Sequence, residues 1–285
     1  MNQKTISKEF SVTGIGLHSG VDVSMTVKPA DVNAGIVFRR ADLSPAVDIK
    51  VAPSSIKEAV MCTLLTKDGD QNLSVSTIEH LMSAFAMFEI DNVLVEVNAP
   101  ELPVMDGSSF EFTQILTSIG IVEQFAARKG IKILRPIHVE HEGKFAEVLP
   151  HDTLKYEFKI EWDHPVIAAT NDHIIFEYNL DEYIKMISKA RTFGFYEQLE
   201  YLHKNNLAKG ASLDNAVGIS NEGVLNEGGL RYEDEFVRHK LLDAIGDFYV
   251  GGYILGHFNC YKSGHTLNNK LLHAIFADKD AWEYI

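Results

Sequence analysis

Hydrophobic and polar residues alternate with the two-residue period of a half-buried β-strand at several places along the chain. In the clearest case every second residue from Val21 to Val27 is apolar. The glycine-rich segment just before it, Gly14–Gly20, permits a tight turn or the close approach of a ligand. Further strand-like segments run at 61–65, 93–97, 131–134, 157–162, 174–178 and 253–261. The pattern therefore predicts a protein rich in β-strands.

Between these strands, apolar residues recur at every third or fourth position, which is the period of an amphipathic helix. The first such segment opens within 74–80 and runs to Phe88. Ser76 and Glu79 fit a capping box, in which the glutamate bonds the backbone N–H of the cap residue. Glu79 is therefore expected either to cap this helix or to serve in catalysis. Further helical segments are expected at 112–119, 181–189, 239–247 and 271–276.

The order helix, strand, glycine-containing loop and helix occurs twice, with little identity between the two copies. This weak internal repeat predicts two domains of similar build. Residues 126–130 are expected to link them, with residues 1–127 in the first domain and 128–285 in the second. His80 and His239 occupy matching positions near the starts of matching helices. Two such domains packed face to face would bring these histidines together.

The composition is that of a globular protein. With 285 residues and 46% hydrophobic content, the chain can bury one large core or two ordinary ones. The first residues, to Ser11, are polar and lack the apolar segment of a signal peptide, and no stretch approaches the length needed to cross a bilayer. We therefore expect a cytoplasmic protein without a transmembrane segment.

Charge and cysteine content narrow the range of ligands. The formal net charge of −14 argues against nucleic acid or an anionic membrane surface as the main partner, so an anionic substrate would need particular Lys and Arg residues. The two cysteines, Cys62 and Cys260, are far apart and form no CxxC pair. Neither a disulfide framework nor a cysteine zinc site is indicated. Any metal is therefore expected to be held by His and carboxylate.

His239, Asp243 and Asp247 are spaced four residues apart and would form a polar column on a helix. An imidazole and a carboxylate one turn apart can hold one metal ion, although such a pair by itself is more often simply exposed. Together with His80, this column offers two histidines and one aspartate. Three protein ligands are what a catalytic zinc site uses while leaving a position for water.

Two further side chains complete a hydrolytic site. Glu79 immediately precedes His80 and could accept a proton from the zinc-bound water, whose pKa falls to about 7. His265 lies in a glycine-flanked loop and could donate a proton or stabilise a developing oxyanion. A metal-bound water, a base and an acid together are the groups needed to hydrolyse an amide or ester. The same metal ligands also suit a non-haem Fe(II) oxygenase, but such an enzyme has no need of a base at Glu79.

The chain also contains the segments GIGLHSG (14–20), STIEHL (76–81), PVMDGS (103–108), RTFGF (191–195), HKLLD (239–243) and GHTLNN (264–269). In this order, and spread over essentially the whole chain, they resemble segments of the UDP-3-O-acyl-N-acetylglucosamine deacetylase family. Any one of them would be a weak match, whereas the full set in register is highly specific.

The resemblance implies two α+β domains, each with a mainly antiparallel sheet and two helices, and with the helices sandwiched between the sheets. It also implies zinc-dependent removal of acetate from the nitrogen of the UDP-linked acylated N-acetylglucosamine, the committed step of lipid A synthesis in Gram-negative bacteria. The implied cofactor is Zn²⁺, and Fe²⁺ would suit the same site. We expect a monomer. A nucleotide-sugar-binding protein with a structural metal is the non-enzymatic alternative.

Carried over by position, the resemblance assigns the chemistry to particular residues. Glu79 becomes the general base, and Thr192 would hydrogen-bond the tetrahedral intermediate. His265 would be the cationic partner or general acid, with Asp247 orienting it. The implied zinc ligands are His80, His239 and Asp243.

The resemblance also implies where the substrate binds. Lys240 and Lys262 would meet the diphosphate and sugar and so provide positive charge that the acidic chain otherwise lacks. The segment 164–195 matches an insert that helps to enclose the acyl chain. The implied uridine-binding residues are Glu161 and Trp162, and the implied acyl-lining residues are Phe193 and Leu199.

Overall fold

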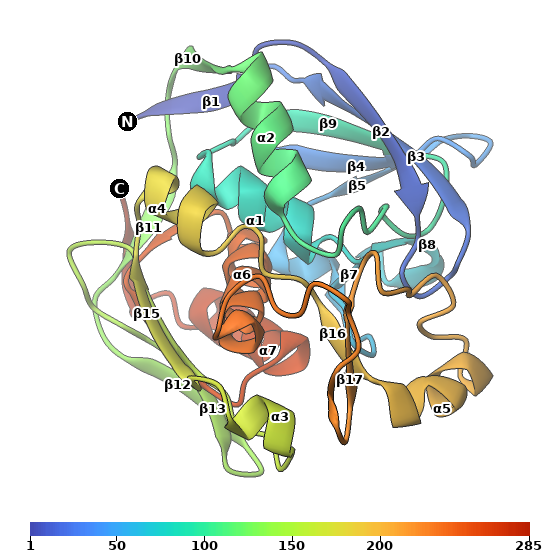
Figure 1. The fold of residues 1–285 in the computed structure, drawn as a ribbon. Coiled ribbons are helices and arrows are strands. Elements are labelled where there is room, and N and C mark those ends of the chain that lie inside the picture. The colour runs from blue at the N-terminus through green and yellow to red at the C-terminus, as the bar shows by residue number, and fades with distance from the viewer.

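The computed structural model describes residues 1–285, and its first half is built on a five-stranded sheet (Figure 1). The strands lie in the spatial order β2-β3-β9-β4-β5, and every neighbouring pair is antiparallel except β9 and β4. Buried residues alternate with more exposed ones along β3 and β9, as their sequence pattern predicts. The strands are β2 (Phe10–Ile15), β3 (Asp22–Pro29), β4 (Ile36–Arg40), β5 (Val47–Lys50) and β9 (Val93–Val97).

The second half contains a five-stranded sheet with the same topology. Its strands lie in the order β12-β13-β20-β14-β15. Again only one neighbouring pair is parallel, namely the central strand β20 with β14, the third of these strands along the chain. In both sheets the strand used last therefore lies in the centre. The strands are β12 (Ile137–His141), β13 (Lys144–Leu149), β14 (Lys155–Lys159), β15 (His173–Glu177) and β20 (His257–Tyr261).

Two main helices accompany each of these sheets. In the first half α1 (Glu79–Met87) leads into β9 and α2 (Phe110–Ile119) follows it. In the second half α6 (Glu235–Tyr249) precedes β20 and α7 (His265–Ala277) follows it. Figure 1 shows α1, α6 and α7 between the two five-stranded sheets. The predicted α+β class with two similar domains is thus confirmed.

The repeat extends to smaller elements, of which the sequence pattern indicated only the strand near 61–65 and the helix near 181–189. Each half inserts a three-stranded sheet before its α1 or α6 helix. In the first half these strands are β6 (Ile56–Lys57), β7 (Leu64–Lys67) and β8 (Asp70–Ser76), preceded by the short helix η1 (Pro53–Ser55). In the second half they are β16 (Phe193–Phe195), β17 (Val217–Ser220) and β18 (Gly223–Val224). The short helices of the second half are α3 (Pro165–Ala168), α4 (Leu180–Met186), η2 (Tyr196–Gln198) and α5 (Leu199–Lys204).

One expected strand, 253–261, is divided in the structure, and the single-strand prediction was wrong. β19 (Tyr253–Leu255) pairs with β11 (Gly130–Ile133), which also pairs with β21 (Trp282–Tyr284). Beyond Gly256 the chain enters the five-stranded sheet as β20. A Cβ atom at Gly256 would lie 3.0 Å from the backbone oxygen of Leu149, so the chain changes sheets at a point of close backbone approach.

The buried Arg128 lies where the chain passes from the first half to the second. β1 (Asn2–Ile6) pairs with β10 (Ile121–Ala127), and every sheet draws its strands from one side of the expected 127/128 boundary. The Arg128 guanidinium then bonds the carboxylates of Asp91 and Glu89, both at 2.8 Å, and the hydroxyl of Tyr249 at 3.0 Å. Because Arg128 ties the end of α1 to the end of α6, the halves are held in one orientation. The boundary itself remains a prediction.

A single hydrophobic core runs through both halves and includes residues from both five-stranded sheets and from α1, α2, α6 and α7. The two helices α1 and α6 pack directly on each other inside it. None of the helices is both long enough and apolar enough to span a membrane.

Candidate active site

The site lies where α1 and α6 cross. All residues of α6 except Arg238 and Lys240 are buried, including its polar column. A Cβ atom at Gly246 would lie only 2.0 Å from the backbone oxygen of Glu79, the first residue of α1. The missing side chain at this glycine therefore allows the start of α1 to rest against α6.

We expect Gly246→Ala to destabilise the protein by about 1–3 kcal/mol, because an added methyl group would force the two helix backbones apart. Denaturant unfolding would measure this change, and metal titration should show weaker binding in the same variant. Gly228→Ala is a matched control, since a Cβ atom there meets nothing within 4 Å. Wild-type stability and wild-type metal affinity in Gly246→Ala would contradict the close approach.

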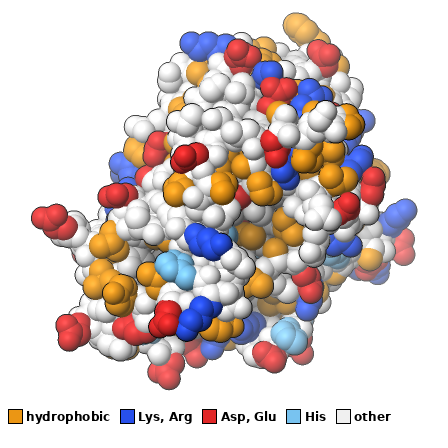
Figure 2. Space-filling model, turned by 90° about the vertical axis from the view of Figure 1, so that its right-hand side faces the viewer, with side chains coloured by type: hydrophobic (Ala, Val, Ile, Leu, Met, Phe, Trp, Pro, Cys, Tyr) orange, Lys and Arg blue, Asp and Glu red, His pale blue; other side chains and the backbone are white.

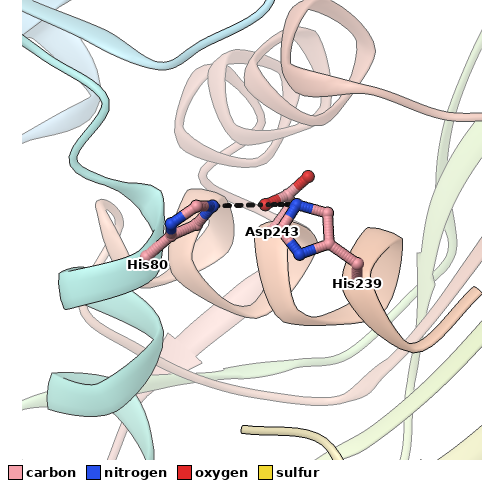
Figure 3. A group of neighbouring side chains, drawn as sticks. All are labelled: His80, His239 and Asp243. Carbon is pink, nitrogen blue, oxygen red and sulfur yellow. Dashed lines mark ion pairs between the residues drawn. The ribbon is translucent and has the colours of Figure 1, made fainter. Parts of the chain in front are cut away.

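His80 from α1 and His239 and Asp243 from α6 point toward one another (Figure 3). Oδ1 of Asp243 lies 3.5 Å from Nε2 of His80 and 3.3 Å from Nε2 of His239. The two imidazole rings are nearly perpendicular, at 79°, with centroids 5.1 Å apart. All three side chains are buried. Two domains thus direct three donor atoms at one small volume.

The hydrogen bonds around these residues leave the facing atoms available as ligands. The Nδ1–H of His239 donates to the backbone oxygen of Ala190 at 3.0 Å, so the Nε2 lone pair faces Asp243. Lys240 donates to Oδ2 of Asp243 at 2.6 Å. Oδ1 of Asp243 is buried without any hydrogen-bond partner. An orphaned carboxylate oxygen is costly in a protein interior, and between two imidazoles it fits a metal ion.

The protonation states suit the same interpretation. Burial lowers the pKa of His239 to about 3, so this imidazole is neutral at ordinary pH. Burial also opposes the charge on Asp243, but the Lys240 ammonium beside it holds the pKa of that carboxyl well below its usual range. A neutral imidazole and an ionised carboxylate are the forms that bind metal.

A second group, Glu79, Asp247 and His265, lies beside the first; its two carboxylates are buried and His265 is half-buried. Nδ1–H of His265 donates to Oδ2 of Asp247 at 2.9 Å. Nε2 of the same ring lies 3.8 Å from Oε1 of Glu79 and 3.8 Å from Oδ2 of Asp243. The ring therefore stands between a fixed carboxylate and the metal group, with one nitrogen toward each.

Two pKa values in this second group are raised, one by burial and the other by neighbouring charges. Burial raises the pKa of Glu79, although the nearby His265 and His80 partly offset the rise. Burial alone would lower the pKa of His265, but the negative charges of Asp247 and Glu79 outweigh it and raise the value to about 9. Near neutral pH the group therefore holds a cationic imidazole beside a carboxylate that accepts a proton more readily than usual.

Two local predictions in this region were wrong. Glu79 does not form a capping box with Ser76, because Ser76 ends strand β8 and the cap position of α1 is Ile78. The Glu79 carboxylate instead accepts the Thr63 N–H at 3.1 Å. His265 is the first residue of α7 rather than a loop residue. Both residues are therefore held at helix starts, where a side chain is positioned more rigidly than in a loop.

An apolar cavity of about 230 Å³ adjoins the metal group. Thr192, Phe193 and Leu199 line it, as does Leu17 from the first half. The ring of Phe193 lies 6.2 Å from that of His239, measured between centroids. Of the expected insert 164–195, only residues 192–195 reach the cavity, and most of the remaining wall comes from residues 196–225. β15, within that range, is instead an edge strand of the large sheet.

The remaining expected substrate residues lie in three places. Lys240 is at the metal group, bonded to Asp243. Lys262 donates to Oε1 of Glu161 at 3.0 Å. Trp162 contacts Phe193 edge-on, with ring centroids 5.5 Å apart. The structure thus places Trp162 against Phe193, which lines the cavity, and pairs Lys262 with Glu161 at the surface.

On the face shown in Figure 2, hydrophobic side chains are exposed across the middle, while basic and acidic side chains are interspersed with them. Several large apolar side chains around the cavity are exposed, namely Met61, Tyr196, Leu213 and Leu225.

Comparison of the sequence with known proteins is consistent with this geometry. A family model described as UDP-3-O-acyl N-acetylglycosamine deacetylase matches residues 3–277. The chain belongs to this deacetylase family. The resemblance seen in the sequence segments is therefore confirmed, and the chain is an amide hydrolase. The same metal ligands would suit an oxygenase or a binding protein, so the ligands alone do not exclude these alternatives. Membership of the deacetylase family does exclude them.

Relatives from several bacteria match over the full chain. A UDP-3-O-acyl-N-acetylglucosamine deacetylase of Francisella tularensis subsp. tularensis is 88% identical over 285 residues, covering 100% of both chains. Proteins of the same name from Idiomarina loihiensis and Shewanella frigidimarina are each 49% identical. These alignments cover 100% and 99% of this chain and 93% and 92% of the relatives.

The sequence pattern did not identify three residues that contribute to this candidate site. The backbone oxygen of Ala190 orients His239, and backbone groups carry no sequence signal. Thr63 bonds both Glu79 and Asp247, but it lies in a segment without a motif. Asn268 donates to Oδ2 of Asp247 at 2.8 Å. The sequence could have indicated this last contact, because Asn268 lies three residues after His265 and so lies on the same face of a helix.

Proposed function

We propose that the chain hydrolyses the N-acetyl amide of UDP-3-O-acyl-N-acetylglucosamine and releases acetate, the committed step of lipid A biosynthesis in a Gram-negative bacterium. The substrate follows from the names of its full-length relatives. The observation that carries the chemistry is the placement of a metal-binding group directly beside a base and a cationic imidazole. The proposal includes a cytoplasmic, monomeric enzyme.

We assign the metal to His80, His239 and Asp243. The two facing Nε2 atoms and the unpartnered Oδ1 of Asp243 suit Zn²⁺, and Fe²⁺ would accept the same donors. When bound, the ion supplies a coordinated water with a pKa of about 7 and polarises the amide carbonyl. Lys240 holds the other oxygen of Asp243, which keeps Oδ1 directed at the histidines.

Glu79 acts as the general base. Its Oε2 is held by the Thr63 N–H at 3.1 Å, which leaves Oε1 facing the reaction volume. The pKa of this carboxyl is raised, chiefly by burial, so that it takes a proton from water more readily than an ordinary glutamate. The same proton can later pass to the departing amine.

His265 carries the positive charge of the reaction. Its Nδ1–H is fixed by Asp247 at 2.9 Å, so Nε2–H is the group that can face the developing oxyanion or the leaving nitrogen. Thr192, on the cavity wall, would donate its hydroxyl to the tetrahedral intermediate. An imidazolium and a hydroxyl would thus stabilise charge that exists only in the transition state.

The rest of the substrate would lie along the cavity and the adjoining surface. Phe193 and Leu199 would contact the acyl chain, because both line the apolar cavity. Lys240 and Lys262 would receive the diphosphate and sugar, Lys262 by exchanging its bond to Glu161 for a phosphate oxygen. The proposed uridine contacts are Glu161 and Trp162.

Metal analysis combined with an acetate-release assay tests the proposal. The purified chain should contain one zinc ion and release acetate from the UDP-linked acylated sugar. Metal removal by a chelator should abolish release, and added Zn²⁺ should restore it. A zinc-loaded chain that releases no acetate from this substrate would contradict the assignment.

We expect Asp247→Asn to move the basic limb of the kcat/KM profile to lower pH. Activity requires the protonated His265, so it falls as pH rises through the imidazole pKa of about 9. Removing the Asp247 charge lowers that pKa, and the limb should move down by about 1 pH unit or more. Zinc content should not change. An unmoved basic limb would mean that another group ionises there.

A further inference from the structure

Thr63 lies between the two carboxylates of the second group but belongs to neither helix that carries them. It directly precedes β7 in the small sheet of the first half and is fully buried, at 0% exposure. Its backbone oxygen accepts the N–H of Thr77 at 3.1 Å. Thr77 in turn has a left-handed backbone, with φ of 57°, at the turn that leads into α1. Thr63 and the start of α1 are therefore fixed to each other.

The two polar groups of Thr63 bond different carboxylates. Its N–H donates to Oε2 of Glu79 at 3.1 Å, and its hydroxyl lies 2.6 Å from Oδ1 of Asp247. Glu79 begins α1 in the first half, whereas Asp247 is on α6 in the second. One residue thus connects the base to the partner of the cationic imidazole across the junction between the halves.

The direction of the hydroxyl bond follows from the surrounding donors. Oγ1 of Thr63 also lies 3.5 Å from Nδ1 of His265, but that nitrogen donates its own proton to Asp247. The hydroxyl proton therefore points to Oδ1 of Asp247. Asn268 donates to Oδ2 at 2.8 Å, so the carboxylate receives donors at both oxygens and cannot rotate freely.

We infer that Thr63 is a positioning residue for the hydrolysis. Its N–H holds Glu79, and its hydroxyl holds Asp247 and, through Asp247, the ring of His265. Hydrogen bonds to buried carboxylates are strong and directional, and a small misplacement of acid and base lowers the rate of a preorganised site. This inference rests on the proposed function, in which Glu79 and His265 move the protons.

The substitution Thr63→Val tests the hydroxyl alone, because it nearly keeps the shape and retains the N–H that bonds Glu79. It leaves Oδ1 of Asp247 buried without that donor. We expect kcat to fall about tenfold or more, with KM changed by less than about threefold and zinc content unchanged. Thr63→Ser restores a hydroxyl at the same place and should recover most of the rate.

Thr66→Val is the matched control. Thr66 lies in β7 of the same small sheet and is equally buried, at 1% exposure, but its hydroxyl bonds the backbone oxygen of Ser55 at 3.4 Å. If loosening of the sheet caused the loss, both variants would lose rate. We expect wild-type kcat in Thr66→Val, and an equal loss in both would overturn the inference.

A double-mutant cycle with Asp247→Asn identifies the route of the effect. Thr63→Val should add little to Asp247→Asn, because both act on the same contact. The inference would be overturned if the two substitutions lowered kcat independently, so that their fold losses multiplied in the double variant. An unchanged kcat in Thr63→Val, or loss of zinc from that variant, would also overturn it. Failure of the proposed function is separate, since it would appear as absence of acetate release from the wild-type chain.

Discussion

The substitution Glu79→Gln should lower kcat by about 100-fold or more while zinc remains bound, because the amide keeps the size of the side chain but cannot accept a proton. Glutamine can still accept the Thr63 N–H through its carbonyl oxygen. The three metal donors are also untouched. The variant therefore separates proton transfer from the shape of the site, and single-turnover acetate release together with metal analysis would measure both.

A matched control exists just beyond the other end of α1. Glu89→Gln removes a carboxylate charge that pairs with Arg128 and Lys4, away from the metal group. We expect this variant to retain kcat, although its stability should fall. Near-normal turnover in Glu79→Gln would show that the carboxylate at 79 is not the base and that the attacking water loses its proton elsewhere.

Removal of a metal donor should have a larger effect. His239→Ala deletes one of three ligands, so the affinity for zinc should fall by more than about 100-fold. Loss of a residue that only orients a ligand typically lowers metal affinity by about 10- to 100-fold, and loss of the ligand itself should cost more. Acetate release should fall to background at ordinary zinc concentrations. Isothermal titration with Zn²⁺ and a metal count on the dialysed protein would measure the loss.

His257→Ala controls for zinc bound at other histidines. His257 and His173 both lie beside Glu157 on the second five-stranded sheet, with Nε2 atoms 3.3 and 2.9 Å from its carboxylate oxygens. These residues have no role in the proposed reaction, so the variant tests whether zinc held elsewhere contributes to the metal count. The control should keep one tight zinc ion and full activity. Full zinc occupancy in dialysed His239→Ala would show that the metal is not held where we place it.

Much of the fold could be predicted from the local pattern of hydrophobic and polar residues. The strand at 93–97 and the short helix near 181–189 follow from periodicity, because burial of alternate or every third and fourth residue is a local property. The repeat was accessible for the same reason. The division at Gly256 was not, since nothing local shows that Tyr253 and Tyr261 join different sheets.

The residue types of the site were also accessible from sequence. The spacing of His239 and Asp243 places both on one helix face, and Glu79 adjoins His80 whatever the fold. The roles of these residues, however, depend on contacts between the halves. Oδ1 of Asp243 becomes an orphaned acceptor only because α1 brings His80 to it, and Gly246 permits that approach.

The sequence by itself determined the family, the α+β repeat and the set of groups able to bind metal and move protons. Only the tertiary structure decided which atoms face the metal, that Glu79 is held by Thr63 instead of capping its helix, and that residues 196–225 form most of the apolar wall. The physical reason is that periodicity records which face of an element is buried. Hydrogen-bond direction and pKa depend on partners that are distant in the chain, such as Thr63 and Asp247, which are 184 residues apart.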